Sequence, residues 1–262
     1  MGSSINIDSW RKFSRHIRSN KSKGLMPELH NFPDSVLVGG CQRSGTTMLS
    51  EIIMKSDDIG SLPGIDKELS AALALVGHIS IPNTHRYCFQ TTYVNDCYPE
   101  YWTSGTSNKL VWMVRNPLSV VYSLTRFSER FCLDGLFMSC GRFYMSEEDE
   151  HRFNKYGSWT ISSVKKACYC YNAKINQIFS IVEKMGRDKV LIIDYDELIL
   201  DKDGILSVIF DFIDVSYTPE FSHFVHNKSL NKACKLSDKK RDLINSSCEQ
   251  HYNSIRQLML AV

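Results

Sequence analysis

The chain has 262 residues, 43% of them hydrophobic, and a formal net charge of +2. Its length and apolar content are typical of a single domain with a full hydrophobic core, and its nearly balanced charge excludes a strongly basic surface of the kind that binds nucleic acid. No stretch of about 18 apolar residues and no apolar signal segment occurs, so we expect a cytoplasmic protein with neither a membrane nor a nucleic acid as partner. We expect one domain over 1–262, with its core near 34–230, a peripheral segment at 1–30 and a C-terminal helix at 236–260.

The nine cysteines indicate neither a metal site nor a disulfide framework. They are odd in number and form no C-x-x-C pair, and the nearest spacing, Cys168-x-Cys170, lies in a segment with helical character. This distribution is typical of reduced, partly buried thiols in a cytosolic protein. We therefore expect no metal cofactor.

An apolar run that ends in a glycine-rich loop is the clearest functional signal in the sequence. Residues 36–38 are typical of a buried parallel strand, and Gly40 and Gly45 have the spacing of a phosphate-binding P-loop. Thr46 stands where that motif has its lysine, and the cation of this loop is Arg43 instead. Because such a loop directs backbone N–H groups and the positive end of a helix at an anion, the pattern predicts a phosphate site.

Strands and helices alternate along the rest of the chain. In order, the sequence predicts a helix from Thr46 to about Lys55, an extended piece at 59–62, a helix at 67–79, a strand at 109–114, a helix within 115–127, a helix at 159–185, a strand at 189–194, helical turns from Tyr195 to 213, and the C-terminal helix. Residues 80–108 and 128–157 show no clear period, and we expect them to be irregular. The alternation predicts an α/β fold with a P-loop-like central parallel sheet flanked by helices and with ligands at the carboxyl ends of the strands.

A second anion site is predicted where the next strand ends. Arg115 follows this strand directly, and the helix after it, with Asn116 as N-cap and Pro117 at its first position, carries Ser123. Two phosphate sites on one rim imply a nucleotide with phosphates at both ends. QRSGTT together with RNPLSVVYS closely resembles the paired signatures of the sulfotransferases that use 3′-phosphoadenosine 5′-phosphosulfate (PAPS), and the resemblance covers roughly residues 36–230.

The resemblance implies roles for the matching residues. The 5′-phosphosulfate would be held by Arg43, Ser44, Gly45, Thr46 and Thr47, and the 3′-phosphate by Arg115 and Ser123. Tyr195 in KVLIIDYDEL would lie near the adenine, and Lys228 in HNKSLNK would close over the 3′-phosphate, unless it is a solvated surface lysine. Arg43 and Met48 replace the lysine and tryptophan of cytosolic members, so the chain is more similar to the tyrosylprotein, heparan and bacterial small-molecule branch. PAPS would be the co-substrate and 3′-phosphoadenosine 5′-phosphate (PAP) the product.

Sulfuryl transfer needs a cation at the leaving oxygen and a base for the proton of the acceptor. Arg43 and the N–H groups of the loop are placed for the first task. Glu68 is the candidate base, because Lys67-Glu68 resembles the pair that supplies the base in heparan-type members and because Lys67 would help to keep the carboxylate ionised. Alternatively, Glu68 is a first-turn residue favoured by the helix dipole. The other candidates for the base are Asp66, His78 and His85.

The acceptor is expected to be a small molecule with a hydroxyl or amine group. Its pocket would be walled by aromatic residues of the two irregular segments, namely Tyr87, Phe89, Tyr93, Tyr98, Tyr101, Trp102, Phe127, Phe131, Phe137, Phe143 and Tyr144. The acidic run 147–150 is typical of a solvated helix start but would also attract a cationic acceptor, for which a natural product such as a guanidinium alkaloid of the saxitoxin type is one hypothesis.

Two other functions stay open at the level of sequence. One is a small-molecule kinase that uses ATP and magnesium on the same loop, against which Thr46 in place of lysine and Arg115 at the strand end both argue. The other is a nucleotide-binding protein without catalytic activity. The sequence does not fix the oligomeric state.

Overall fold

A four-stranded parallel sheet forms the centre of the computed structural model, which describes residues 6–20, 24–94, 107–127 and 130–260. Its strands are β1 (Val36–Gly40), β2 (Cys88–Gln90), β3 (Lys109–Val114) and β4 (Val190–Asp194), in the spatial order β2-β1-β3-β4. The register places Val38 beside both Gln90 and Val111. Because all the pairings are parallel, the carboxyl ends of the strands meet at one edge of the sheet.

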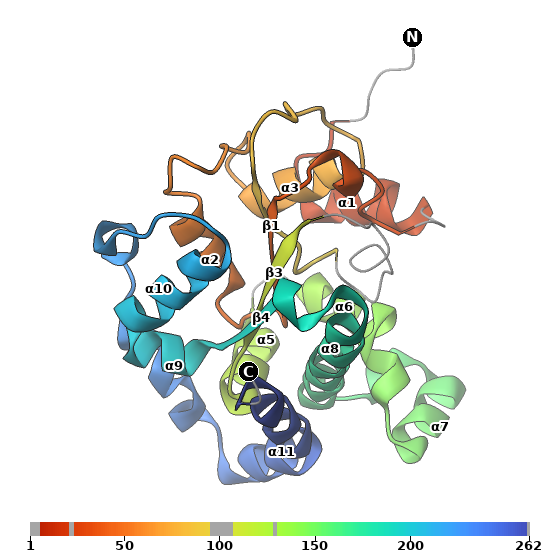
Figure 1. Ribbon diagram of the computed structural model, residues 1–262. Helices are drawn as coiled ribbons and strands as arrows, with labels where there is room; N and C mark the ends of the chain where they lie inside the picture. The colour runs from red at the N-terminus through yellow and green to blue at the C-terminus, as the bar shows by residue number, and fades with distance from the viewer. Residues whose placement is uncertain (1–5, 21–23, 95–106, 128–129, 261–262) are drawn as a thin grey trace.

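Helices cover both faces of this sheet (Figure 1). One face carries α2 (Thr46–Ile53), α9 (Tyr195–Leu200) and α10 (Lys202–Phe212), and the other carries α3 (Lys67–Leu75), α5 (Pro117–Arg126) and α8 (Ser163–Met185). Successive strand residues point to opposite faces, so Leu37 and Trp112 join one hydrophobic core while Val38 and Met113 join the other. The predicted α/β fold with a parallel sheet between helices is confirmed.

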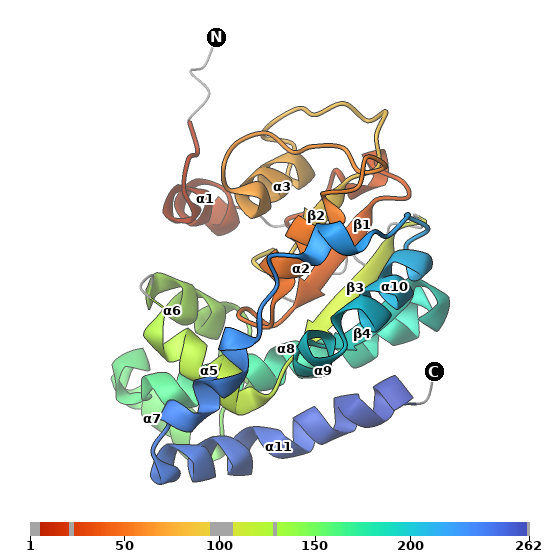
Figure 2. The same ribbon diagram turned by 90° about the vertical axis from the view of Figure 1, so that its left-hand side faces the viewer.

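The other long helices surround this centre. They are α1 (Trp10–His16), α6 (Arg130–Ser139), α7 (Glu147–Tyr156) and α11 (Asp238–Leu260). Figure 2 shows α11 running along one side of the molecule, where it packs against α5 and α8. The N-terminal helix is tied to α3, because Trp10 Nε1 donates a hydrogen bond to the carboxylate of Asp66, the N-cap of α3. The C-terminal helix α11 begins two residues after the predicted start at 236.

Four elements differ from the sequence prediction. The stretch 80–108 contains β2, whose three residues are too few to show a period of two. The stretch 128–157 contains α6 and α7, and α7 shows no apolar period because its one buried side chain is that of Asp149. The helix predicted at 67–79 ends at Leu75, since Gly77 adopts a φ of 74° just beyond it.

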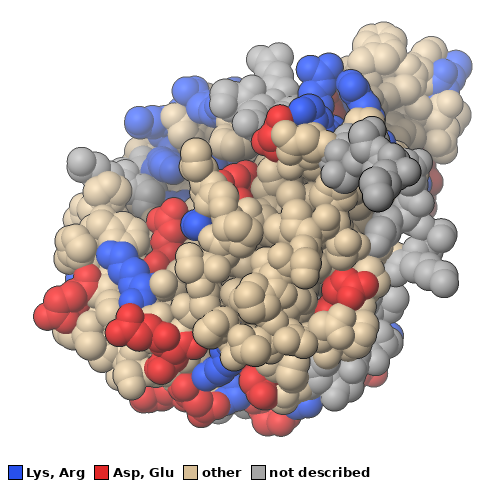
Figure 3. All heavy atoms as spheres, turned by 90° about the horizontal axis from the view of Figure 1, so that it is seen from above, with Lys and Arg blue, Asp and Glu red and all other residues tan. Residues whose placement is uncertain are grey.

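The described surface carries mixed charges. In Figure 3, which views the molecule from above, basic and acidic side chains lie mostly around the margin of the face, and most of its centre is uncharged. Within the described residues, every helix is too short or too polar to cross a membrane. The seven cysteines whose side chains the structure describes are free thiols, six of them buried.

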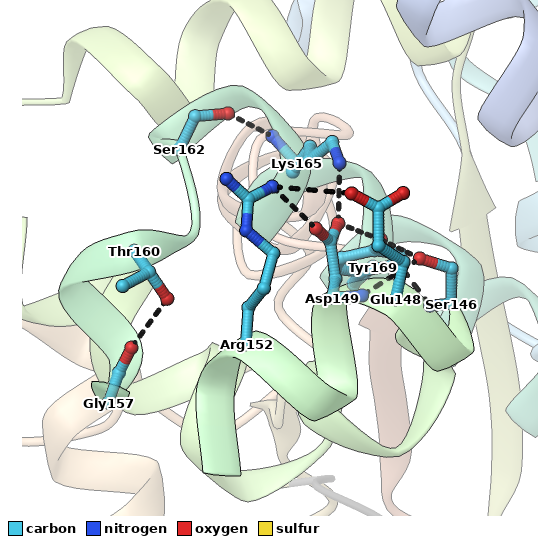
Figure 4. A network of polar contacts seen from close by, with 9 residues as sticks. All are labelled: Ser146, Glu148, Asp149, Arg152, Gly157, Thr160, Ser162, Lys165 and Tyr169. Carbon is cyan, nitrogen blue, oxygen red and sulfur yellow. Dashed lines mark hydrogen bonds and ion pairs between the residues drawn. The ribbon is translucent and has the colours of Figure 1, made fainter. Parts of the chain in front are cut away.

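A buried carboxylate ties α7 to α8 (Figure 4). The side chain of Asp149 is 1% exposed, and its Oδ2 accepts hydrogen bonds from Lys165 Nζ at 2.7 Å and from Tyr169 Oη at 2.6 Å. Ser146 caps α7 by accepting from the N–H of Asp149, and Arg152 Nη1 lies 3.7 Å from Oδ1. Burial raises the pKa of Asp149, but the hydrogen bonds from Lys165 and Tyr169 and the charges of Lys165 and Arg152 outweigh burial and hold this pKa below its ordinary value.

Asp149→Asn is expected to lower the free energy of unfolding by about 2–3 kcal/mol, because the neutral amide gives up charge-assisted hydrogen bonds in a buried site. The folded-state pKa of Asp149 lies below its unfolded value, so its contribution is complete above the unfolded pKa and is lost as the pH falls through the folded pKa. Urea unfolding near neutral pH measures the loss of stability, and urea unfolding near the folded pKa measures its pH dependence. The wild type and Asp149→Asn should become more alike in acid.

Glu148→Gln, the same kind of change on a neighbouring side chain that is 79% exposed, is the control. An equal loss in the two variants would contradict the role of Asp149.

Candidate active site

The loop between β1 and α2 has the backbone of an anion cradle. Gly40 and Gly45 adopt φ values of 135° and 92°, and Arg43 between them adopts 73°. A Cβ atom on Gly40 would lie 2.3 Å from the carbonyl oxygen of Met113, and one on Gly45 would lie 2.2 Å from the ring of Tyr195. Both positions therefore require glycine. The left-handed backbone of Arg43 costs about 1–2 kcal/mol, a strain of the kind that is found at binding sites.

A cavity of about 180 Å³ opens at the start of α2. It is lined by Arg43, Gly45, Thr46, Thr47, Met48, Arg115, Ser123, Tyr195 and Lys232. Residues from the loop after β1, from the end of β3, from α5 and from α9 thus face one space. The positive end of α2 points the same way, because the helix begins at Thr46 and its first N–H groups have no partner within the helix.

The two predicted phosphate motifs touch each other directly. Arg43 Nε donates a hydrogen bond of 3.0 Å to Ser123 Oγ, and the guanidinium of Arg43 lies 4.6 Å from the centre of the Phe127 ring. Ser123 reaches this position because α5 begins as predicted, with Pro117 at its first position and the side chain of Asn116 accepting from the N–H group of Leu118. The loop and α5 therefore form one site rather than two separate clefts.

Arg115 is fixed at the end of β3 by contacts on several sides. It is 3% exposed, its Nη1 donates to the carbonyl oxygen of Arg43 at 3.3 Å, and its guanidinium lies 4.2 Å from the centre of the Tyr195 ring. Asp196 lies 3.4 Å from Arg115 Nε. Tyr195 thus packs against both the loop, at Gly45, and Arg115, while the acidic residue after it holds Arg115 in place.

A third cation among the described side chains lines this cavity, and sequence reasoning missed it. Lys232 lines the cavity, whereas the predicted Lys228 lies in the same 3₁₀ segment, Asn227–Lys235, with a side chain outside the described residues. Burial lowers the pKa of Lys232, and the positive charges of Arg115, Arg43 and Lys235 lower it further. Three mutually repelling cations in one cavity indicate a site for a polyanion. Both lysines belong to the HNKSLNK motif. The sequence therefore indicated this segment, but not which of its two lysines lines the cavity.

One buried hydroxyl of the loop also fits an absent anion. Ser44 is fully buried, and among the described residues its Oγ has no hydrogen-bond partner. Buried hydroxyl groups are nearly always paired in folded proteins, so an unpaired one beside a phosphate cradle suits a ligand oxygen. Of the five predicted loop residues, Ser44 is the one that does not line the cavity.

A second cavity, of about 270 Å³, adjoins the first and shares Arg43 and Thr47 with it. Its other lining residues are Trp10, Ser50, Glu51, Met54, Ile65, Asp66, Lys67, Glu68, Gln90, Tyr93 and Phe127. The candidate base Glu68 therefore opens onto a space that borders the anion site at Arg43.

Both carboxylate oxygens of Glu68 are held by fixed donors. Oε2 accepts from Gln90 Nε2 at 2.8 Å, and Oε1 accepts from the N–H group of Tyr93 at 3.1 Å. Burial raises the pKa of Glu68 well above its ordinary value, and the negative charge of Asp66 acts in the same direction. The N–H group of Tyr93 and the charge of Lys174, a fully buried lysine of α8, oppose this rise.

Lys67 does not have the position that the sequence suggests. Its Nζ donates a hydrogen bond of 2.6 Å to the carbonyl oxygen of Leu62, although the side chain lines the second cavity. The cation that favours the ionised form of Glu68 is that of Lys174. Lys174 lies more than 100 positions further along the chain, so this contact could not be read from local sequence.

The alternative bases are placed less favourably. Asp66 lines the second cavity, but its Oδ1 accepts from the N–H group of Leu69 and its Oδ2 from Trp10 Nε1. His78 and His85 line neither cavity. Glu68 is thus the candidate with the most suitable surroundings.

Few of the predicted aromatic residues line the second cavity. Tyr93 and Phe127 do so, and they are joined by Trp10 of α1, which was not predicted because the N-terminal segment was expected to be peripheral. Three others, Tyr87, Phe89 and Phe137, are buried in the core, while Phe143 and Tyr144 are exposed and line neither cavity. Tyr98, Tyr101, Trp102 and the side chain of Phe131 lie outside the described residues.

Comparison with known proteins identifies the family and the fold. A family model for the sulfotransferase domain matches residues 33–255. A sulfotransferase domain from the curacin biosynthetic pathway superposes with a TM-score of 0.50 and 16% identity, covering 79% of this chain and 83% of that one. A sulfotransferase from Alicyclobacillus acidocaldarius superposes with a TM-score of 0.52 and 14% identity, covering 86% of this chain and 95% of that one. These two likenesses show the fold, and no curated protein matches the chain. Because the family model spans most of the sequence, the chain belongs to the sulfotransferase domain family.

Proposed function

We propose that the chain is a PAPS-dependent sulfotransferase that moves a sulfuryl group to a hydroxyl or amine of a small molecule and releases PAP. The pair of adjoining cavities carries this proposal. One gathers the cations Arg43, Arg115 and Lys232, the other presents the carboxylate of Glu68, and the two share Arg43 and Thr47. Group transfer between two substrates needs two such sites that meet at the reacting atom.

The residues of the first cavity suit a nucleotide with phosphates at both ends. The loop N–H groups and the hydroxyl groups of Ser44, Thr46 and Thr47 would bind the 5′ end. Arg115 and Ser123 would bind the 3′-phosphate, with Lys232 added to or replacing the predicted Lys228. Tyr195 would lie near the adenine. Burial lowers the pKa of Lys232 most, and the charges of Arg115 and Arg43 lower it further; an anion among these cations would offset this second effect.

Bound PAPS would supply an activated sulfuryl group. The bond from sulfur to the 5′-phosphate oxygen breaks while a bond from sulfur to the acceptor oxygen or nitrogen forms, and the electron pair of the broken bond stays on the phosphate of PAP. Arg43 would stabilise the charge that develops on this oxygen. Glu68 would take the proton of the acceptor, and the scheme uses no metal ion.

The second cavity would hold the acceptor. Trp10 and Tyr93, with ring centres 4.8 Å apart, and Phe127 offer an apolar wall for a flat part of a small molecule, such as a natural product. A cationic acceptor would meet the carboxylates of Glu51 and Glu68 in this cavity. It would not meet the acidic run 147–150, because no residue of that run lines either cavity.

Calorimetric titration of the whole chain with PAP, and separately with ATP and magnesium, tests the proposed nucleotide. PAP is expected to bind more tightly, because Arg115, Ser123 and Lys232 would contact a 3′-phosphate that ATP lacks. Tighter binding of ATP with magnesium would favour the kinase alternative and overturn the proposal. Release of PAP from PAPS in the presence of a panel of small phenols and amines then separates a transferase from a protein that only binds the nucleotide.

Arg115→Ala is expected to raise the dissociation constant of PAP about 10- to 100-fold and to change that of adenosine 5′-phosphate little, because a charged hydrogen bond to the 3′-phosphate is lost. The shorter ligand controls for damage to the loop, since Arg115 also bonds to Arg43. Arg126, the last residue of α5, lines neither cavity. Arg126→Ala should therefore leave the dissociation constants of PAP and adenosine 5′-phosphate unchanged. Equal losses for both ligands in Arg115→Ala would contradict the assignment.

A further inference from the structure

A single side-chain amide connects the two halves of the site. Gln90 lies at the carboxyl end of β2 and is 5% exposed. Its Nε2 lies 2.8 Å from Glu68 Oε2, 3.0 Å from Thr47 Oγ1 and 3.2 Å from Thr46 Oγ1. The candidate base and both threonines of the phosphate loop therefore contact the same nitrogen atom.

The chemistry of these groups fixes the orientation of the amide. An ionised carboxylate only accepts hydrogen bonds, so the nitrogen of Gln90 faces Glu68 when Glu68 is ionised, which is the orientation in the structure. On the other side, Gln90 Oε1 accepts from Ser50 Oγ of α2 at 3.1 Å. One hydrogen of Nε2 serves the carboxylate, and the two threonine oxygens share the other.

This arrangement also orients the two threonine hydroxyls. Because Thr46 Oγ1 and Thr47 Oγ1 accept from Gln90, the hydrogen of each hydroxyl is left for another acceptor. Thr46 and Thr47 both line the cavity proposed for the nucleotide. Their O–H groups can then donate to the oxygens of a phosphosulfate in that cavity.

We propose, on the basis of the function proposed above, that Gln90 is a positioning residue that holds the Glu68 carboxylate at a fixed place relative to the threonines that bind the phosphosulfate. The acceptor must lie between sulfur and base, and these groups come from separate elements, α2 and α3. Gln90 of the edge strand β2 bridges the two elements. A misplacement of about 1 Å in such a site can reduce the rate by about 10²-fold.

The hydrogen bond from Gln90 Nε2 is also expected to favour the ionised form of Glu68, because it donates to the carboxylate. Asp66 on α3 opposes the ionised carboxylate, and Lys174 on α8 favours it. Arg43, Lys67 and Glu51 are the other charged groups of the cavity. Burial favours the protonated form, and the N–H group of Tyr93 and the side chain of Thr92 act against it. Gln90 Nε2 is a further donor, 2.8 Å from Oε2.

The test is a carbon-13 NMR titration of the full chain labelled at the glutamate carboxyl carbons, in which Glu68→Gln identifies the signal of Glu68. Gln90→Met keeps the size of the side chain but removes the donor, and the midpoint of Glu68 is expected to rise by about one pH unit. Gln90→Lys restores a donor with a positive charge, and the midpoint is expected to fall below that of the wild type. Gln177→Met makes the same change at a buried glutamine of α8 that lines neither cavity, and should leave the midpoint in place.

Opposite shifts in Gln90→Met and Gln90→Lys support the proposal, because a general loss of packing would move both variants the same way. An unchanged midpoint in Gln90→Met, or shifts of the same sign, would overturn it. If Gln90→Met does not fold, Gln90→Lys alone decides, and a midpoint at or above the wild-type value overturns the proposal. The titration requires neither PAPS nor acceptor, whereas failure of the wild-type chain to bind PAP would count against the proposed function.

Discussion

Glu68→Gln is expected to reduce turnover of PAPS by about 10²–10⁴-fold while leaving the dissociation constant of PAP almost unchanged, because general-base catalysis contributes rate enhancements of this size. The amide keeps the shape of the side chain and can still contact Tyr93 and Gln90, but it cannot accept the proton of the acceptor. Glu68 lines the second cavity and not the cation cavity, so nucleotide binding should persist. Turnover is measured as PAP release with the panel of phenols and amines, and PAP affinity by calorimetry.

The pH dependence of the wild-type rate gives an independent check. Because burial raises the pKa of Glu68, the rate should increase with pH through a value well above the ordinary 4.5 and should fall where the carboxyl is protonated. The same raised pKa makes the ionised carboxylate unfavourable for folding above its unfolded pKa. Glu68→Gln should therefore unfold at the same or a higher temperature than the wild type, which separates lost chemistry from lost structure.

Glu51→Gln is the matched control, since Glu51 lines the same cavity and is exposed. It should retain turnover within a few-fold when the acceptor is neutral. If both variants lost activity equally, or if Glu68→Gln stayed fully active, the base would have to be another group.

Arg43→Ala is expected to slow sulfuryl transfer by about 10²–10³-fold, the usual cost of removing one preorganised donor from a developing oxyanion. The loop backbone would survive, because alanine removes only the side chain and its contacts with Ser123 and Phe127. Single-turnover measurement at saturating PAPS isolates the chemical step from any loss of affinity.

Arg43→Lys separates charge from geometry at the same position. Lysine retains the positive charge but not the planar fork that bonds to Ser123, so it should recover part of the rate. If Arg43→Ala kept a single-turnover rate close to that of the wild type, the loop N–H groups alone would account for stabilisation of the charge on the leaving oxygen.

The parts of the site that follow strand ends could be predicted from sequence. Gly40 ends the apolar strand β1, Gly45 closes the loop that follows it, and Arg115 stands directly after β3. Because parallel strands end at one edge, local pattern and sheet geometry together bring these residues to one rim. The position of Ser123 followed from a helix whose cap was visible in the sequence. Both predictions need only local sequence patterns and the assumption that the strands are parallel.

The remaining parts depend on contacts that no local rule reports. Gln90 belongs to a strand of three residues, Trp10 to an N-terminal helix held by a side-chain bond to Asp66, and Lys232 to a 3₁₀ segment near the end of the fold. Their neighbours in space are distant in sequence. Cavity volume does not identify the site either. A cavity of about 880 Å³, lined among others by Glu28 and Asn83, is larger than both cavities of the site but contains no residue of the two motifs.

The two cavities draw on different parts of the chain, and this has a consequence for engineering. The cation cavity includes residues that follow the ends of β1 and β3, whereas the other cavity also draws on α1, the segment around Ile65, the first turn of α3 and the side of α2 that ends at Met54. Under the proposed function, changes to the side chains of the second cavity other than Glu68 are expected to alter which acceptor fits, while the residues of the cation cavity are kept. Directed libraries should therefore be concentrated on Trp10, Met54 and Ile65.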